Sequence, residues 1–275
     1  MTLLKAIILA IVQGITEFLP ISSSGHLAIL QILFNIKEGN VFFSQVLHFG
    51  TLLSILLVYH KQVINMIVEF FKMLGSLIKR EKIELNHYQK LALYIILATI
   101  PTVIIALFIE KYLDQLYMSS LIIGLCFIIT AFMIYFIDIN IYGKNTVRIT
   151  DAGVPKVLAI GAVQGVAALP GISRSGSTIF ISHILGINKK DAVDFSFLLA
   201  IPAMLGGFIL GLKDIFKEGS QVSFDINAIV GLIVSFITGV LAIRLIKVLI
   251  KKKKFHVFSY YLVVLGIICI VLNFI

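Results

Sequence analysis

Charged side chains are scarce in this chain of 275 residues. They make up 13% of it, whereas 59% of the residues are hydrophobic and the mean hydropathy is +1.06. A soluble globule needs more polar surface than this composition provides. Apolar runs of about 20 residues, long enough for a helix to cross a bilayer, recur to the end of the chain. The composition excludes a soluble protein and predicts one membrane domain over residues 1–275, with an N-terminus that no signal peptidase removes.

Cysteine is almost absent, and no sequence motif for reading nucleic-acid bases is present. Cys126 and Cys269 each lie inside an apolar run, far from any CxxC-type spacing, which excludes a disulfide framework and a cysteine zinc site. The net charge of +9 comes mostly from lysine and arginine in connecting segments. In a membrane protein such charge indicates topology and contact with anionic lipid. We therefore expect membrane lipids as partners and no nucleic acid.

What the chain does contain is an internal repeat. The stretch IVQGITEFLPISSSGH from Ile11 returns as AVQGVAALPGISRSGS from Ala162, with the proline displaced by one place. The identical pairs are Val12 and Val163, Gln13 and Gln164, Gly14 and Gly165, Ser22 and Ser173, Ser24 and Ser175, and Gly25 and Gly176. We expect a first repeat over about 1–140 and a second over about 152–275.

About six apolar segments are long enough to span a bilayer, three after each copy of the repeat. They lie near residues 45–60, 91–109, 119–137, 195–212, 226–249 and 256–275. The segment 63–78 mixes charged with apolar residues, which predicts an amphipathic helix on the membrane surface. The fold class expected is therefore all-α integral membrane.

Each copy of the repeat is interrupted by glycine, proline and serine, and its backbone would be left unpaired in hydrocarbon. This favours two re-entrant helix hairpins. An odd number of spans separates them, so they enter from opposite faces in an inverted-topology repeat, a plan common in transporters. Lysine-rich segments at 79–82, 144–156, 189–190 and 251–254 predict the cytoplasmic side. Both termini then lie on the outer side of the membrane, and the first hairpin enters the membrane from that side.

Three charged or titratable side chains in the hairpins require partners, because an isolated charge in the bilayer is costly. If the hairpin tips meet near the midplane, Arg174 lies beside Glu17, Ser23 and His26. Arginine offers a planar fork of donors that suits phosphate. Further phosphate donors are expected at the half-helix starts. They are the hydroxyls of Ser22, Ser24, Ser173 and Ser175 and the backbone around Gly25 and Gly176.

This group of residues suits attack on a diphosphate. Ser23 can attack phosphorus if His26, three residues on, removes its proton. Glu17 has two alternative roles: it orients His26, or it holds a divalent cation, Mg²⁺ or Ca²⁺, together with Gln13. The second copy has Ala168 where the first has Glu17, and this asymmetry favours a reaction centre over a symmetric pore.

Simpler interpretations remain for single residues. A serine in a membrane helix commonly bonds its own backbone, a glycine permits close packing, and Arg174 alone can bind lipid headgroups. The residues His48, Asp138, Lys189 and Asp194 fall at predicted span ends, where solvated side chains are usual.

The stretches QGITEFLPISSSGH and PGISRSGSTI together resemble the undecaprenyl-diphosphate phosphatase, or bacitracin-resistance, family. The resemblance implies six spans plus two re-entrant pairs. It also implies hydrolysis of the C55 diphosphate to the monophosphate with a divalent metal, on the outer side of the bacterial cytoplasmic membrane, which recycles the lipid carrier for cell-wall synthesis. The implied site residues are Gln13, Glu17, Ser23, His26 and Arg174. Many relatives have glutamate where this chain has Gln13, so its metal site is one charge poorer.

Two questions stay open at this level. The nucleophile is either Ser23 or His26, and the oligomeric state, a homodimer included, is not fixed. A carrier or lipid flippase is the alternative function, because inverted repeats with broken helices are a transport architecture. A carrier needs anion donors but neither a nucleophile nor a base, which favours the phosphatase.

Overall fold

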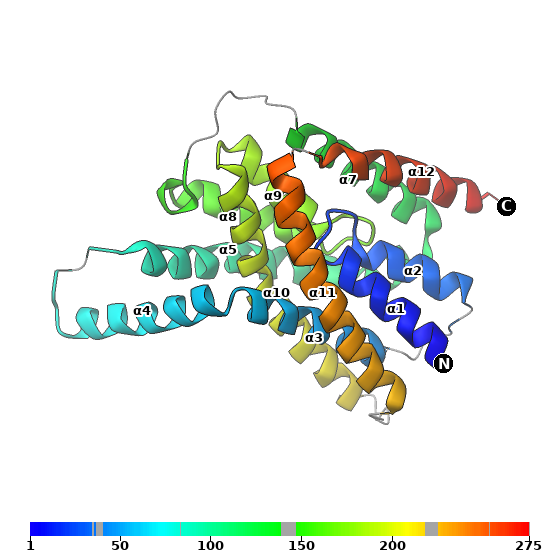
Figure 1. Cartoon of the computed structure of the whole chain (residues 1–275), viewed down its shortest axis with the longest axis horizontal. Helices are drawn as coiled ribbons and strands as arrows, with labels where there is room; N and C mark the ends of the chain where they lie inside the picture. Colours follow the sequence, from blue (N-terminus) through cyan, green and yellow to red (C-terminus); the bar gives the residue numbers. More distant parts are fainter. Residues whose placement is uncertain are drawn as a thin grey trace.

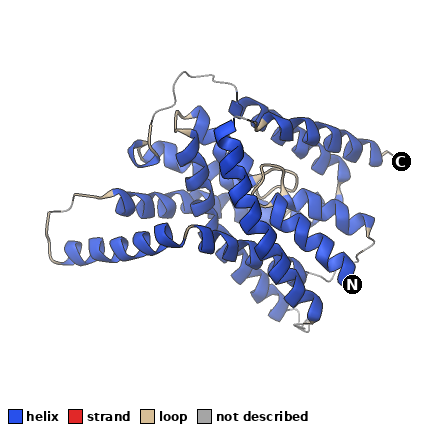
Figure 2. Cartoon of the chain, in the orientation of Figure 1, coloured by secondary structure: helices blue, strands red, loops and turns tan. Residues whose placement is uncertain are grey.

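The computed structural model describes the whole chain except residues 35, 37–40, 83, 139–146, 218–224, 253 and 275. Its described elements are helices (Figure 2), and the β pairing recorded among the described residues is a single bridge between Val147 and Ile187. The predicted all-α class is confirmed. Parts of the predicted lysine-rich segments, residues 144–146 and 253, lie outside the described residues.

The helices follow one another along the chain (Figure 1). The first half contains α1 (Leu3–Thr16), α2 (Ser23–Leu33), α3 (Val41–Val58), α4 (His60–Ile78), α5 (His87–Glu110), α6 (Leu113–Met118) and α7 (Ser120–Asp138). The second half contains the short 3-10 helix η1 (Ile149–Asp151), α8 (Val154–Val166), α9 (Arg174–Ile184), α10 (Lys189–Lys217), α11 (Ile226–Lys252) and α12 (His256–Leu272).

Among the described residues, four helices are long and apolar enough to cross a membrane, namely α5, α7, α10 and α11. The pair α3 and α4 passes the same test together but bends by 79°, so the number rises to five if that pair is one span. Many large apolar side chains are exposed on the surface of the molecule. Such a surface suits contact with lipid and is unfavourable in water. Examples are Phe108, Phe132, Ile209 and Val264. The chain is a multi-pass membrane protein.

The two copies of the repeat form two pairs of short helices, α1 with α2 and α8 with α9, each of which turns back on itself. In Figure 1, α1 and α2 lie side by side with their connecting turn inside the molecule. The helix α1 packs against α11 of the second half, and α8 packs against α5 of the first. A Cβ at Gly14 would lie 1.9 Å from Thr238 Oγ1, and one at Gly165 would lie 2.7 Å from Ile105 Cβ. These glycines therefore allow the helices of the two halves of the chain to pack closely.

Polar groups near the helix ends have partners and are not merely solvated. Asp138 at the end of α7 accepts hydrogen bonds from Lys189 Nζ, 3.3 Å away, and from the backbone N–H of His256, 3.0 Å away. Tyr59, fully buried at the α3–α4 bend, donates to Asp194 Oδ1 on α10 over 2.6 Å. The expectation of a solvated side chain is thus wrong for Asp138, whose side chain is 9% exposed, because a buried carboxylate requires partners. Lys189 and Asp194 are partly exposed as well as paired. These contacts fix α7, α10 and α12 at one end.

Candidate active site

The site forms where the two hairpin turns meet, at the first residues of α2 and α9. Ser22 caps α2 by accepting from the Gly25 N–H at 3.4 Å, and Ser173 caps α9 by accepting from the Gly176 N–H at 3.1 Å. The cap hydroxyls also lie 3.3 Å from the hydroxyls of Ser24 and of Ser175, respectively. Serine caps satisfy backbone donors that a helix start leaves free. Both hairpins therefore hold their tips in the same way.

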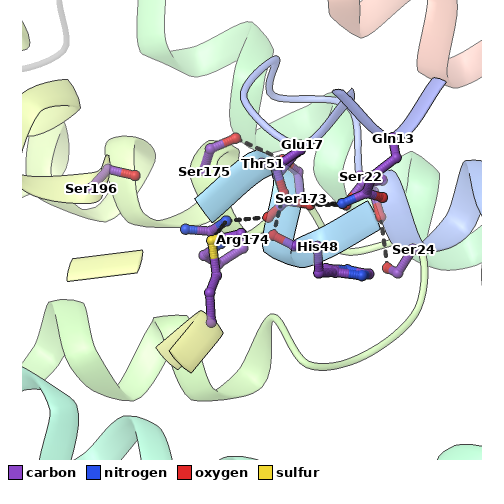
Figure 3. A network of polar contacts seen from close by, with 12 residues as sticks. Gln13, Glu17, Ser22, Ser24, His48, Thr51, Ser173, Arg174, Ser175 and Ser196 are labelled. Carbon is purple, nitrogen blue, oxygen red and sulfur yellow. Dashed lines mark hydrogen bonds and ion pairs between the residues drawn. The ribbon is translucent and has the colours of Figure 1, made fainter. Parts of the chain in front are cut away.

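The carboxylate of Glu17 joins the two hairpins (Figure 3). Its Oε2 accepts from Ser23 Oγ at 2.6 Å and from Gln13 Nε2 at 2.9 Å, and its Oε1 accepts from Arg174. Glu17 is 8% exposed, so these contacts replace water. Buried charges persist when they are paired and hydrogen-bonded in this way. The structure thus brings together Gln13, Glu17, Ser23 and Arg174 from both halves.

His26 lies beside this group but has other partners. Its Nδ1 lies 2.7 Å from the Ser22 carbonyl oxygen, and its Nε2 lies 2.7 Å from the hydroxyl of Tyr261. With both ring nitrogens engaged, the predicted Ser23–His26 hydrogen bond is not formed in this arrangement. The physical reason is local: the bond to the Ser22 carbonyl, four residues back, turns the ring away from Ser23. The Ser23 hydroxyl donates to the Glu17 carboxylate instead.

Arg174 keeps one donor nitrogen free for a ligand. Nη2 contacts Glu17 and lies 3.6 Å from Met204 Sδ, while Nη1 is buried and has no hydrogen-bond partner within the part of the chain that the structure describes. A buried guanidinium nitrogen without a partner is rare and calls for an acceptor. A phosphate oxygen would meet that need.

The two glycines predicted near the phosphate differ in their surroundings. A Cβ on Gly25 would lie 2.6 Å from Cζ of the Phe127 ring, so close packing alone accounts for this glycine. A Cβ on Gly176 would meet Ser173 Cβ at 3.1 Å and Pro20 Cβ at 3.3 Å, which is tight but milder. Their backbone N–H groups already donate to the cap serines. Phosphate binding by these two residues therefore stays a prediction.

The turn of the first hairpin is strained where the second is not. Ser22 has φ of 67°, in the left-handed region that side chains other than glycine seldom adopt. Its counterpart Ser173 has φ of −77°, and the second turn instead reverses at Gly171, with φ of 94°. Such strain persists where surrounding contacts determine the conformation, and it is concentrated at functional sites.

Sequence comparison identifies the family of the chain. Residues 6–268 match the family described as bacitracin resistance protein BacA. The chain belongs to that family. It is 42% identical to an undecaprenyl-diphosphatase of Alkaliphilus metalliredigens, over 99% of both chains. It is 38% identical to undecaprenyl-diphosphatases of Korarchaeum cryptofilum, over 97% of this chain and 98% of that one, and of Methanosphaera stadtmanae, over 98% of each.

In this BacA family member, His48 reaches the site although the sequence placed it at a solvated span end. It lies on α3, its Nδ1 is 2.8 Å from the Ser44 carbonyl oxygen, and Figure 3 shows its side chain among the residues of the polar network around Glu17. Tyr117 and Tyr261 also reach the site, through Ser24 and His26. Of these three residues, only His48 could have been predicted as a site residue from the sequence, because it is a titratable group within an apolar run.

The residues of this BacA protein offer a divalent cation few ligands of their own. Among the described residues, no three His, Cys, Asp or Glu side chains cluster as a metal site. Gln13 Oε1 is buried with no hydrogen-bond partner in the described ranges, and it can ligate a cation. The Oε1 of Gln164 is unpaired in the same ranges, although Ala168 replaces the carboxylate there. Glu17 and Gln13 fit a hard cation by donor chemistry. They fit it only if phosphate oxygens complete the shell.

Proposed function

We propose that this chain hydrolyses undecaprenyl diphosphate to undecaprenyl phosphate and inorganic phosphate. Membership of the BacA family and full-length similarity to undecaprenyl-diphosphatases support this substrate. The observation that carries the chemistry is the Glu17 carboxylate, which touches a serine hydroxyl with one oxygen and a guanidinium with the other. That arrangement places a base, a nucleophile and a phosphate-binding group within one hydrogen-bonded cluster.

Ser23 is the nucleophile in this proposal. Glu17 Oε2 takes the proton of the Ser23 hydroxyl, 2.6 Å away, as Ser23 Oγ bonds to the terminal phosphorus. The bond from that phosphorus to the bridging oxygen breaks, and undecaprenyl phosphate leaves. Arg174 holds the transferred phosphate through its unpaired Nη1 and offsets its charge. Water then attacks the phosphorus of the phosphoserine, and its proton passes through the Tyr261 hydroxyl, 2.7 Å from Nε2, to His26. The bond from phosphorus to Ser23 Oγ breaks, inorganic phosphate leaves, and Glu17 returns its proton to Ser23 Oγ.

A divalent cation would be held by Gln13 and Glu17 together with oxygens of the diphosphate. When bound, it would supply positive charge against the phosphate oxygens. The unpaired Gln13 Oε1 beside the carboxylate supports this proposal.

For the membrane arrangement, we propose six spans and two re-entrant pairs in an inverted repeat. The short paired helices α1–α2 and α8–α9 support the re-entrant pairs, and the apolar α3 and α12 supply the fifth and sixth spans. The strong bend after α3 leaves α4 free to lie along the membrane surface.

We further propose the cytoplasmic membrane as the location, with the active site open to the outer side. The network around Asp138 supports this orientation, because it joins Lys189 at the start of α10 to the start of α12, which follows the lysine run 251–254 in sequence. Asn227 contacts the Met1 carbonyl, and Ser120 contacts Asn273, which places each terminus beside a helix start.

The deciding experiment measures phosphate release from undecaprenyl diphosphate by the purified protein in detergent, with and without a chelator. We expect Ser23→Ala to lose activity by about 10³-fold or more, as removal of a nucleophile does. Ser76→Ala, a serine on α4 outside the site, is the matched control and should match wild type.

Each other outcome has a defined meaning. Full activity in Ser23→Ala excludes the serine nucleophile and points to His26. An inactive wild type that binds the lipid and moves it across liposomes intact would establish a carrier. Activity that persists in the presence of the chelator would reject the proposal that a divalent cation takes part.

A further inference from the structure

His26 is held by an aromatic residue from the far end of the chain. Tyr261 on α12 places its hydroxyl 2.7 Å from His26 Nε2, and the two rings stack with centroids 5.6 Å apart and planes 18° apart. Phe127 on α7 meets the same imidazole edge-on, with centroids 5.3 Å apart and planes at 73°. The imidazole therefore lies between two aromatic rings that belong to the packed pair α7 and α12.

The hydrogen bonds define which nitrogen carries the proton. The Ser22 carbonyl oxygen can only accept, so Nδ1 of His26 is the donor in their 2.7 Å contact. Nε2 of a neutral imidazole is then an acceptor, and the Tyr261 hydroxyl donates to it. The same hydroxyl can accept from Nε2 once the ring is protonated. It remains a partner of Nε2 before and after a proton transfer, so the proton reaches Nε2 through this hydroxyl.

We propose that Tyr261 is a positioning residue that fixes the plane and the Nε2 direction of His26 for the reaction. This inference rests on the proposed phosphatase function. An imidazole that exchanges protons is commonly oriented by a second group on its ring. Here the stack sets the plane and the hydroxyl sets the direction of Nε2.

A purely structural role for the Tyr261 hydroxyl fits the surroundings poorly. Tyr261 is 47% exposed on a helix that faces lipid, where a phenylalanine ring would pack as well. Its neighbour Tyr260 is 61% exposed, and its ring contact is with His256, away from the site. The two tyrosines thus form a matched pair on one helix, and one of them touches His26.

The test compares Tyr261→Phe with Tyr260→Phe in the full-length protein. Each variant loses one hydroxyl, and Tyr261→Phe keeps the ring that stacks on His26. Phosphate release should show kcat lowered by about tenfold in Tyr261→Phe with KM unchanged, because the hydroxyl orients His26 and does not bind the headgroup. Tyr260→Phe should keep both constants.

A second readout does not depend on turnover. Diethyl pyrocarbonate modifies unprotonated imidazole nitrogens, and peptide mass spectrometry reports the rate at His26. Loss of the Tyr261 hydroxyl frees Nε2, so modification of His26 should be several-fold faster in Tyr261→Phe and unchanged in Tyr260→Phe.

Equal behaviour of the two variants in both assays would overturn the proposal, and so would a change in KM alone. If the wild type releases no phosphate, the phosphatase proposal fails first and the catalytic part of this inference falls with it. Faster modification in Tyr261→Phe would then still establish the contact, and this separates the two failures.

Discussion

The two hairpins share a framework and differ in chemistry. In both, a serine caps the second helix, a glycine N–H donates to that serine, and a second serine hydroxyl lies 3.3 Å from the first. The first residue of the capped helix is Ser23 in one hairpin and Arg174 in the other. These two side chains bond different oxygens of the same carboxylate, Glu17. The two hairpins thus share a frame that carries a hydroxyl at one of two matching positions and a guanidinium at the other.

Gln13 and Gln164, each one turn before position 17 or 168, show what the Glu17 carboxylate contributes. Gln13 Nε2 donates to Glu17 at 2.9 Å. The counterpart Gln164 precedes Ala168, and its Nε2 instead donates over 3.4 Å to Thr102 Oγ1 and to the Leu199 carbonyl oxygen. In the first hairpin, the two oxygens of Glu17 join charged and hydroxyl side chains of both hairpins, Arg174 and Ser23, whereas the matching position of the second hairpin is Ala168.

The largest expected effect comes from removing the charge on Glu17. Glu17→Gln keeps the size of the side chain, but an amide cannot take the Ser23 proton or balance the buried Arg174. We expect kcat/KM for phosphate release to fall by about 10²- to 10⁴-fold, the range seen for loss of a general base. The assay uses the purified protein and undecaprenyl diphosphate.

Glu110→Gln at the exposed end of α5 is the matched control for that variant. It removes the same charge and should leave turnover unchanged. A Glu17→Gln protein as active as Glu110→Gln would show that the carboxylate only holds the two hairpins together.

Much of this site could be predicted from the sequence, because the repeat is local and its logic is chemical. The internal identity predicted the two hairpins, and the cost of isolated charge predicted that Arg174 and Glu17 need partners. The partner of Ser23 could not be predicted, because sequence spacing puts His26 within one turn but does not show that its Nδ1 bonds the Ser22 carbonyl. The contact of Tyr261 with His26 could not be predicted, because the two residues are 235 positions apart and the packing of α7 and α12 brings them together.

A smaller effect tests packing at matching glycines of the two hairpins. Gly25→Ala forces its Cβ to within 2.6 Å of the Phe127 ring and 3.0 Å of the Gly171 backbone, whereas the nearest atoms to a Cβ at Gly176 are 3.1 Å away. We expect Gly25→Ala to lower the free energy of unfolding by about 1–3 kcal/mol, the cost of overpacking, and Gly176→Ala to lower it by less. Thermal unfolding in detergent reports both.

Gly206→Ala is the control for that pair, since no described residue outside its own helix backbone lies within 4 Å of its Cβ position. Alanine there should stabilise α10 by up to about 1 kcal/mol through helix propensity. Equal melting temperatures for Gly25→Ala and Gly206→Ala would mean that the Phe127 ring moves aside without cost.

The smallest effect concerns the strained turn. Ser22→Gly relieves a positive φ worth about 1–2 kcal/mol. It also gives up a cap worth a few tenths of a kcal/mol and about 0.5–1 kcal/mol of backbone entropy. These terms nearly cancel, so the melting temperature should barely change. Ser173→Gly has the same losses without the relief, because its φ is −77°, and it should cost about 1 kcal/mol.

The comparison of these two variants isolates the strain, because both caps lose the same contacts to a glycine N–H and a second serine. If Ser22→Gly proves as destabilising as Ser173→Gly, the left-handed turn costs the fold nothing and the hairpins are energetically alike. If Ser22→Gly melts like wild type but releases phosphate more slowly, the strain serves to aim the Ser22 carbonyl at His26. Glycine at this point would let that carbonyl turn away, and the asymmetry between the hairpins would then extend from side chains to backbone.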